Sequence, residues 1–283
     1  MPNPYFLTLE LLVLALFGLC VRHAWRGGPH VVWQLLAGVV FGVILEWTTL
    51  QQLHIYHYGR FLVMLGEEPL AVGVAWGCII YSARLFSDAS SLPEWARPVL
   101  DGLLALNVDL AMDAIAVRLG MWDWGRGVQS EYFGVPYANF WAWFWVVFTF
   151  SFGLRLFTYR ANLAARWLGP LGAILVGLLG VVGANSLFAA PPGGYVLTLA
   201  GLLAGMVALV LSLRPRFLVR PAPALVFWVP FAFHAYFLLA GLVSGVILRP
   251  PFLLGMSLAM LALTLYWHRA AVRARAVSCV GRV

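Results

Sequence analysis

Long apolar runs alternate with short polar breaks along almost the whole chain. A helix needs about 20 mostly apolar residues to cross a lipid bilayer. Clusters of glycine and proline, such as 27–29, 191–194 and 250–251, fall at or near the breaks. The pattern therefore predicts an all-α fold, a polytopic transmembrane helical bundle of about nine spans, with eight as the alternative. The predicted spans are residues 5–22, 31–52, 69–86, 98–119, 136–157, 170–189, 195–213, 224–247 and 252–268.

The composition supports a membrane protein. The chain is 63% hydrophobic and only 10% charged, with a mean hydropathy of +0.89. Typical soluble domains are about half apolar and about one quarter charged, so an ordinary soluble domain and a disordered tail are both excluded. We predict that residues 1–283 form a single integral membrane domain. The first span lacks a basic leader and carries Glu10, which favours a retained helix over a cleaved signal peptide.

The charges predict the orientation in the membrane. All 18 basic residues are arginine, and none of the 11 acids lies after residue 131. If nine spans alternate between two faces, 14 arginines fall on one face, called face A here, and 4 on the opposite face B. By the positive-inside rule face A is cytoplasmic, so we expect the N-terminus outside and the C-terminus inside a bacterial inner membrane. The excess of basic over acidic residues then reflects contact with membrane lipids rather than with nucleic acid.

Two segments next to face B are dense in aromatic and polar residues. They are residues 46–60, which end the second span, and residues 120–143, which begin the fifth. Tryptophan and tyrosine are common at membrane interfaces, but an interfacial belt does not explain polar residues that continue into the spans. We expect the loops 53–68 and 120–135 to lie together and to cover a cavity between the second, fourth and fifth spans.

Carboxyl groups inside the spans give the strongest functional signal. Glu46 and Asp113 each lie six residues inside the face-B end of a span, which is about 9 Å deep at the helical rise. Asp109 lies one turn deeper than Asp113, on the same side of its helix. Glu10 lies at a similar depth in the first span. Such groups usually face a protein interior or a wet cavity; the alternative is that hydrogen bonds to other polar side chains fasten helices together.

A protonated carboxyl beside aromatic faces in an apolar cavity suits one reaction in particular. The acid can protonate an electron-rich alkene, and the aromatic faces can stabilise the carbocation that results. We expect Asp113 to be the leading proton donor, Glu46 the next candidate, and Asp109 the partner of Asp113, because two carboxyls that close cannot both ionise cheaply. Asn139 is a candidate for orienting the attacking water. The substrate would be a lipid-soluble polyene or isoprenoid.

Signals for other chemistry are weaker. The chain has no P-loop, dinucleotide fingerprint, HExxH or GxSxG motif, and we expect no cofactor. His54 and His57 could contribute to a metal site, but no other histidine is nearby in sequence, and we predict no bound metal. Asn185, Ser186 and His234 are the few polar groups in the spans of the C-terminal half. Residues 161–283 are therefore expected to be a scaffold or the wall of an apolar tunnel.

Two blocks of the sequence resemble a known family. One is Asp109-x3-Asp113-x6-Gly120-Met121-Trp122-Asp123-Trp124, continued by Tyr132-Phe133-Gly134-Val135-Pro136-x2-Asn139-Phe140-x2-Trp143. The other is Glu46, then Tyr56-x-Tyr58, then Pro69-Leu70-x4-Ala75-Trp76. Over about residues 40–160, the motif-bearing core, the chain resembles the carotenoid hydratase family, which includes γ-carotene 1′-hydroxylases and bisanhydrobacterioruberin hydratases. The substrate-binding candidates are Trp47, Tyr56, Tyr58, Trp122, Trp124, Tyr132, Phe133, Asn139, Phe140 and Trp143.

The resemblance implies a cofactor-free addition of water across the terminal double bond of an acyclic carotenoid end group. Three alternatives stay open on the sequence: an isoprenoid cyclase or isomerase that uses the same acid, a transporter with an intramembrane carboxylate path, and a non-catalytic lipid-binding subunit. A transporter predicts polar groups through the whole bilayer, whereas those noted above are concentrated towards face B. The oligomeric state is not predicted by the sequence.

Overall fold

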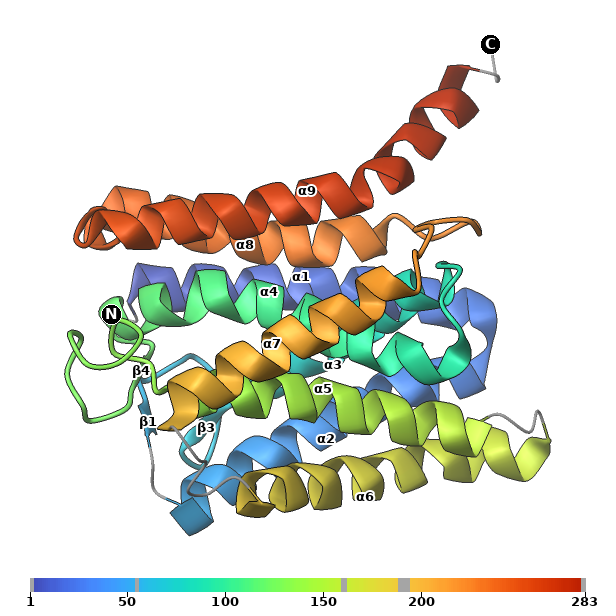
Figure 1. Ribbon diagram of the computed structural model, residues 1–283. Coiled ribbons are helices and arrows are strands. Elements are labelled where there is room, and N and C mark those ends of the chain that lie inside the picture. The colour runs from blue at the N-terminus through green and yellow to red at the C-terminus, as the bar shows by residue number, and fades with distance from the viewer. Residues whose placement is uncertain (1–2, 54–55, 159–161, 188–193, 281–283) are drawn as a thin grey trace.

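The computed structural model describes residues 3–53, 56–158, 162–187 and 194–280. This part of the chain is a bundle of helices that run roughly side by side (Figure 1). It contains two short 3-10 turns, Glu94–Ala96 and Val246–Leu248, and four strands of two residues each. The α-helices are α1 (Pro4–Gly27), α2 (Pro29–Leu53), α3 (Leu70–Asp88), α4 (Arg97–Arg118), α5 (Tyr137–Thr158), α6 (Leu163–Leu187), α7 (Gly194–Ser212), α8 (Leu225–Ser244) and α9 (Pro251–Val280).

The predicted membrane bundle is confirmed. Each of the nine predicted spans overlaps one α-helix of the described chain, and eight of these helices are long and apolar enough to cross a membrane. The exception is α4, whose charged residues make it too polar to qualify by composition. The chain is thus an integral membrane protein in which one polar helix accompanies eight apolar ones.

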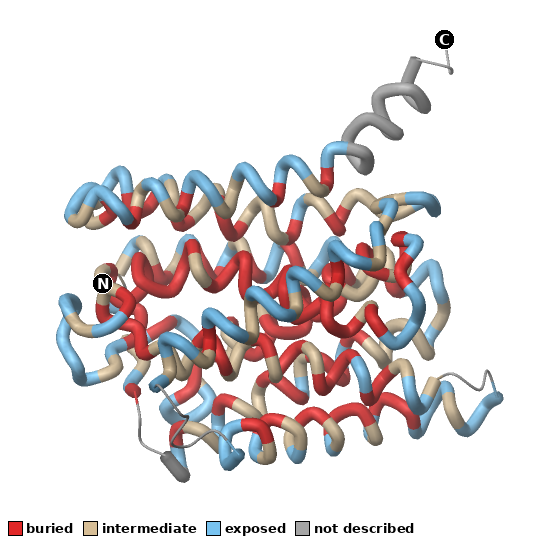
Figure 2. Tube along the Cα trace, viewed as in Figure 1, coloured by how far each residue is buried: buried red, intermediate tan, exposed pale blue. Residues whose placement is uncertain are grey.

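The polar helix α4 is shielded by its neighbours. Nearly all of its residues are buried, and it packs against α3, α5, α8 and α9 (Figure 2). By contrast, α7 exposes most of its residues, which are almost all apolar. This is the distribution expected in lipid, where apolar side chains face outward and charged groups face the bundle interior.

Small residues bring α2 and α3 close together. A Cβ atom added to Gly42 would lie 2.6 Å from Trp76 Cβ, and one added to Gly73 would lie 2.4 Å from a methyl group of Val43. Gly77 meets Val39 in the same way. Transmembrane helices often use glycine at a spacing of four for such close approach. The contact matters for function because it brings the indole of Trp76 close to α2.

Two helix boundaries differ from prediction. Pro170 was expected to open the sixth span but lies inside α6, which begins at Leu163. Pro230 likewise lies inside α8. Proline is tolerated within transmembrane helices because neighbouring groups satisfy the backbone that it leaves unpaired. At the C-terminus the helix α9 runs to Val280, but the part of it that can span a membrane, Pro251–Arg269, agrees with the predicted span 252–268.

The two aromatic loops lie together at face B, as predicted. Strand β1 (His57–Tyr58) pairs antiparallel with β4 (Trp122–Asp123), with Tyr58 opposite Trp122. A second hairpin in the first loop joins β2 (Met64–Leu65) to β3 (Glu68–Pro69). These strands are found at the same end of the bundle in Figure 1. They hold both loops over the ends of α2, α4 and α5.

Candidate functional site

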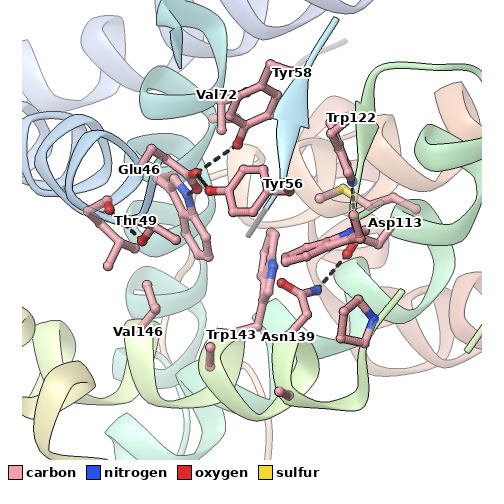
Figure 3. Close-up of a pocket in the computed structure, with 18 of the residues that line it drawn as sticks. Glu46, Thr49, Tyr56, Tyr58, Val72, Asp113, Trp122, Asn139, Trp143 and Val146 are labelled. Carbon is pink, nitrogen blue, oxygen red and sulfur yellow. Dashed lines mark hydrogen bonds between the residues drawn. The ribbon is translucent and has the colours of Figure 1, made fainter. Parts of the chain in front are cut away.

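A cavity of about 500 Å³ lies under these loops. Its lining comes mainly from α2, α3, α4, α5 and the two loops, with further residues from α1, α6, α7 and α8. Most of the lining is aliphatic or aromatic, and the main polar groups project from two opposite walls (Figure 3). One wall carries Glu46 and the other carries Asp113. A largely apolar cavity with a few convergent polar groups is typical of a site for a small apolar molecule.

The carboxyl of Glu46, on α2, accepts three hydrogen bonds. Trp76 Nε1 donates to Oε1 at 2.7 Å, and Tyr58 donates to Oε2 at 2.8 Å. The hydroxyl of Tyr56 also donates to Oε2. The pKa of each tyrosine is raised well above its usual value, mainly because the side chain is buried and next because the Glu46 carboxylate is close. Both phenols therefore keep their protons, and this wall consists of one carboxylate held by three donors.

The opposite wall holds a pair of aspartates on α4. Trp122 Nε1 donates to Asp113 Oδ1 at 2.5 Å, and Asn139 Nδ2 donates to Asp113 Oδ2 at 2.6 Å. The same nitrogen of Asn139 lies 3.3 Å from Asp109 Oδ2. Both aspartates are buried, and Asp109 Oδ1 has no partner among the described residues. One amide therefore bridges two carboxyls, an arrangement in which the pair shares a proton more easily than it carries two charges.

Aromatic rings surround the space between the walls. The rings of Trp76 and Trp143 have centroids 4.1 Å apart, and those of Tyr56 and Trp124 are 4.6 Å apart. The buried indole nitrogen of Trp124 has no hydrogen-bond partner among the described residues. Aromatic faces attract positive charge, and a free indole N–H can donate to an oxygen atom. The cavity is thus suited to a cation and to a nearby water or hydroxyl.

Charged residues mark the rim of the cavity. Arg126 and Glu131 both line it and form an ion pair at 2.5 Å, with side chains that are 53% and 28% exposed. The second oxygen of Glu131 accepts a hydrogen bond from the backbone of Tyr137, at the start of α5. Because this pair is partly open to solvent and lies in the α4–α5 loop, it marks the side of the cavity nearest to water.

Most, but not all, of the predicted site residues line the cavity. Eight line the cavity: Glu46, Tyr56, Tyr58, Asp113, Trp122, Trp124, Asn139 and Trp143. Asp109 lies behind Asp113 as its partner. The other four residues do not line the cavity. Trp47 is 55% exposed, and Phe140 is buried in the core. The hydroxyl of Tyr132 donates to the carbonyl of Leu110, and the ring of Phe133 packs against that of Tyr132.

Two expected polar roles look different in the structure. Glu10 accepts hydrogen bonds from the backbone of Leu62 and Val63 at 3.0–3.1 Å, so it fixes the first loop. The amide nitrogen of Asn139, expected to orient water, is instead occupied by the two aspartates. Sequence analysis also left Trp76 out of the site, although it belongs to the family-like motif. Its indole reaches Glu46 through the glycine-mediated packing of α2 and α3, which single-helix patterns do not indicate.

Polar groups are not confined to the face-B half, contrary to expectation. His234 Nε2 lies 3.0 Å from Asn107 Oδ1, to which Thr264 also donates at 2.7 Å. Nearer face A, Arg155 forms an ion pair with buried Asp101 at 2.6 Å. Each cluster pairs several of its polar groups inside the bundle, but Asp101 Oδ1, Arg155 Nε and His234 Nδ1 have no hydrogen-bond partner among the described residues. The sequence could not show these pairings because they join side chains of different helices, α4 with α8 and α9 in one cluster and α4 with α5 in the other.

On the face of α4 that carries the aspartate pair, apolar side chains separate this pair from the Asp101 cluster. On α4 the positions 101, 105, 109 and 113 follow one another at a spacing of four, so they share a face. Ala105, between Asp101 and Asp109, is fully buried, as are Phe144 and Val147 on α5. A Cβ added to Gly102 would lie 2.8 Å from the Phe144 ring, which shows how closely the helices pack here. The carboxyls of the cavity therefore communicate with face B.

No group of three histidine, cysteine, aspartate or glutamate side chains is placed to hold a metal ion within the part of the chain that the structure describes. His54, one of the two histidines considered for a metal site, lies outside the described residues. His57 belongs to strand β1.

Comparison with known families gives a match over most of the chain. Residues 3–210 match the family model described as carotenoid biosynthesis protein. The match extends on both sides of the 40–160 core and includes both walls of the cavity. Searches of curated proteins and of solved structures found no match.

Proposed function

The chain belongs to the carotenoid biosynthesis protein family, and from that premise we propose that it hydrates the terminal double bond of an acyclic carotenoid end group. One observation carries the proposal: two carboxyl walls face each other across an apolar, aromatic cavity. Hydration of an alkene needs an acid for the carbon and a base for the water. The two walls provide a candidate for each.

Asp113 donates the proton. It adds to the less substituted carbon of the terminal double bond, the π electrons form the new C–H bond, and a tertiary carbocation remains on the more substituted carbon. Asp109 and Asn139 position this acid, and their hydrogen-bond geometry lets the pair hold one proton. The proton donor is then regenerated from the face-B side.

Water completes the reaction from the opposite wall. Its oxygen forms the C–O bond to the carbocation, and Glu46 accepts the proton that the water loses. Three hydrogen bonds hold the carboxyl of Glu46 in place for this step. Trp124 also lines the cavity, and the rings of Trp76 and Trp143 stabilise the cation.

The remaining alternatives make different demands. A cyclase or isomerase would share the acid but exclude water, whereas the partly exposed Arg126–Glu131 pair at the rim supports access by water. A transporter would need a polar path to face A, and the layer around Ala105 and Phe144 counts against one. The cavity accommodates a lipid-soluble end group, and we propose a bacterial inner-membrane location with face A in the cytoplasm.

The test is an assay of membranes that contain the protein with a lycopene-like carotenoid, followed by mass analysis. Hydratase activity predicts a product heavier by one water molecule. A product of unchanged mass but different retention indicates a cyclase or isomerase. If the protein neither binds nor converts any polyene, the hydratase proposal is wrong.

A further inference from the structure

One buried carboxyl has no role in the reaction described above. Glu68 lies in β3, opposite Leu65 of the hairpin, and is only 1% exposed. Neither of its carboxyl oxygens has a hydrogen-bond partner among the described residues. Burying a carboxyl without a partner is costly, and unsatisfied buried groups in native proteins call for a specific explanation.

The strand that carries Glu68 packs against α2, the helix that carries the base of the proposed reaction. Burial first, and the charge of Glu46 second, raise the pKa of Glu68 to about 8. Tyr56, which donates to Glu46, also feels the charge of Glu68. Glu46, from α2, is thus the charged group that raises the pKa of Glu68, and Glu68 in turn raises that of Tyr56 in the first loop.

Glu68 also lies on the face-B side of Glu46. Trp76, which bonds Glu46, is nearly two turns inside α3, whereas Glu68 precedes the first residue of α3. Its hairpin packs against α2 and contains the exposed neighbour Glu67. Glu68 is thus buried on the face-B side of the Glu46 wall, next in sequence to an exposed residue.

We propose that Glu68 is a proton relay that carries the proton of Glu46 to water at face B after each turnover. The inference rests on the proposed hydration. That reaction takes one proton from Asp113 and leaves one on Glu46, so the proton must leave the Glu46 wall before the next cycle. No redox partner or further reactant is needed.

The proton balance follows from the coupling of the two glutamates. At rest Glu46 is charged and Glu68 is neutral. When Glu46 gains a proton its charge disappears, so Glu68 releases its own proton to face-B water more easily. Glu68 then takes the proton of Glu46, and both groups return to their resting states. One proton leaves the wall in each cycle.

The experiment compares Glu68→Gln with Glu67→Gln, which removes the neighbouring exposed carboxyl. With enzyme in excess, a single turnover of a lycopene-like carotenoid should proceed within about twofold of the wild type in both variants. With substrate in excess, the rate of Glu68→Gln should fall about tenfold or more, as expected when a proton-transfer group is lost. Glu67→Gln should keep the wild-type rate under both conditions.

Three outcomes overturn the relay. They are an unchanged multiple-turnover rate in Glu68→Gln, an equal loss in single and multiple turnovers, and an equal loss in Glu67→Gln. If Glu68→Gln fails to fold, Glu68→Asp replaces it in the experiment. This variant keeps the carboxyl but shortens the side chain by one methylene group, so it must still slow multiple turnovers more than single ones. Failure of the hydratase proposal is distinguishable, because the wild type itself would then give no hydrated product.

Discussion

The two carboxyl walls differ in what surrounds each acid. Glu46 is a single carboxyl with three donors, whereas Asp113 has two donors and a second carboxyl beside it. Donors stabilise a negative charge, and a neighbouring carboxyl opposes a second one. This contrast supports Asp113 as the acid and Glu46 as the base, although both lie at similar depths in the sequence pattern.

Substituting the carboxyl residue of each wall should block a different step of the proposed hydration. Asp113→Asn removes the proton donor, and turnover should fall by about 10²–10⁴-fold. In deuterated water this variant should also incorporate no deuterium into recovered carotenoid. Glu46→Gln should slow product formation but still permit protonation, so recovered carotenoid gains deuterium. Mass analysis of substrate and product measures both effects.

The control for this comparison is Asp123→Asn, which changes an exposed aspartate in β4. It should keep the wild-type rate and isotope pattern. If Asp113→Asn and Glu46→Gln both retain near wild-type turnover while inserted and folded, the assignment of acid and base is wrong.

Glu68 should make stability depend on pH. Folding raises its pKa from 4.5 to about 8, so between these values the folded protein holds a proton that the unfolded chain has released. The contribution of Glu68 to the free energy of unfolding is complete below pH 4.5 and is lost as the pH rises through about 8. Glu68→Gln should therefore melt at a higher temperature than the wild type at about pH 9, with a smaller difference near pH 5. Thermal melts in detergent measure this, and a wild-type-like pH dependence in Glu68→Gln would contradict it.

At the scale of elements, apolar run length predicted every helix but not every boundary. Each span overlaps its predicted range because roughly 20 apolar residues have few alternatives in a membrane. The predicted start of α6 at Pro170 is wrong, because a proline inside a helix is tolerated better in a membrane bundle than in water. The pairing of β1 with β4 followed from placing both loops at one face, but its register required the structure.

The lining of the cavity was predictable where it comes from local motifs and not where it depends on helix pairing. Glu46, Asp113 and the loop aromatics were identified from their depth and composition. Phe140 and Trp47 carry the same residue types but face the core and the surface, because the orientation of α5 and α2 decides which side meets the cavity. Contributions from Val181 and Phe233 depend on packing that no local pattern shows.

The close contact of α2 with α3 gives a prediction for these elements. Gly73→Val places a Cβ 2.4 Å from the side chain of Val43 and 3.2 Å from its backbone nitrogen, so the helices must move apart. We expect the free energy of unfolding to fall by about 1–3 kcal/mol and turnover to fall as Trp76 leaves Glu46. Thermal melts and the carotenoid assay measure the two effects.

Gly205→Val is the matched control, because a Cβ there on α7 meets nothing within 4 Å. It should leave both stability and turnover near the wild-type values. Equal losses in the two variants would show that glycine as such, rather than the α2–α3 contact, matters.

At the scale of the whole molecule, arginine placement predicts the orientation. The helices that the structure describes preserve the alternation on which the division of 14 arginines to face A and 4 to face B depends. We expect the C-terminus in the cytoplasm. A C-terminal alkaline phosphatase fusion should be inactive, and a green fluorescent fusion should fluoresce. The opposite pattern would reverse the orientation and place the cavity mouth on the cytoplasmic side.

The polar groups along α4 raise the question of whether the bundle conducts protons. The aspartate pair and the Asp101–Arg155 pair lie on one side of α4, but buried Ala105 lies between them and Phe144 packs against Gly102. Proton transfer needs a continuous chain of polar groups or water, and an apolar layer of close-packed side chains provides neither.

Vesicles that contain the protein should therefore keep an imposed pH gradient as long as protein-free vesicles, with or without a membrane potential. A pH-sensitive dye inside the vesicles measures the decay, and a gramicidin-treated sample shows what a leak looks like. Faster decay that Asp113→Asn abolishes would identify a transporter and overturn the one-sided site.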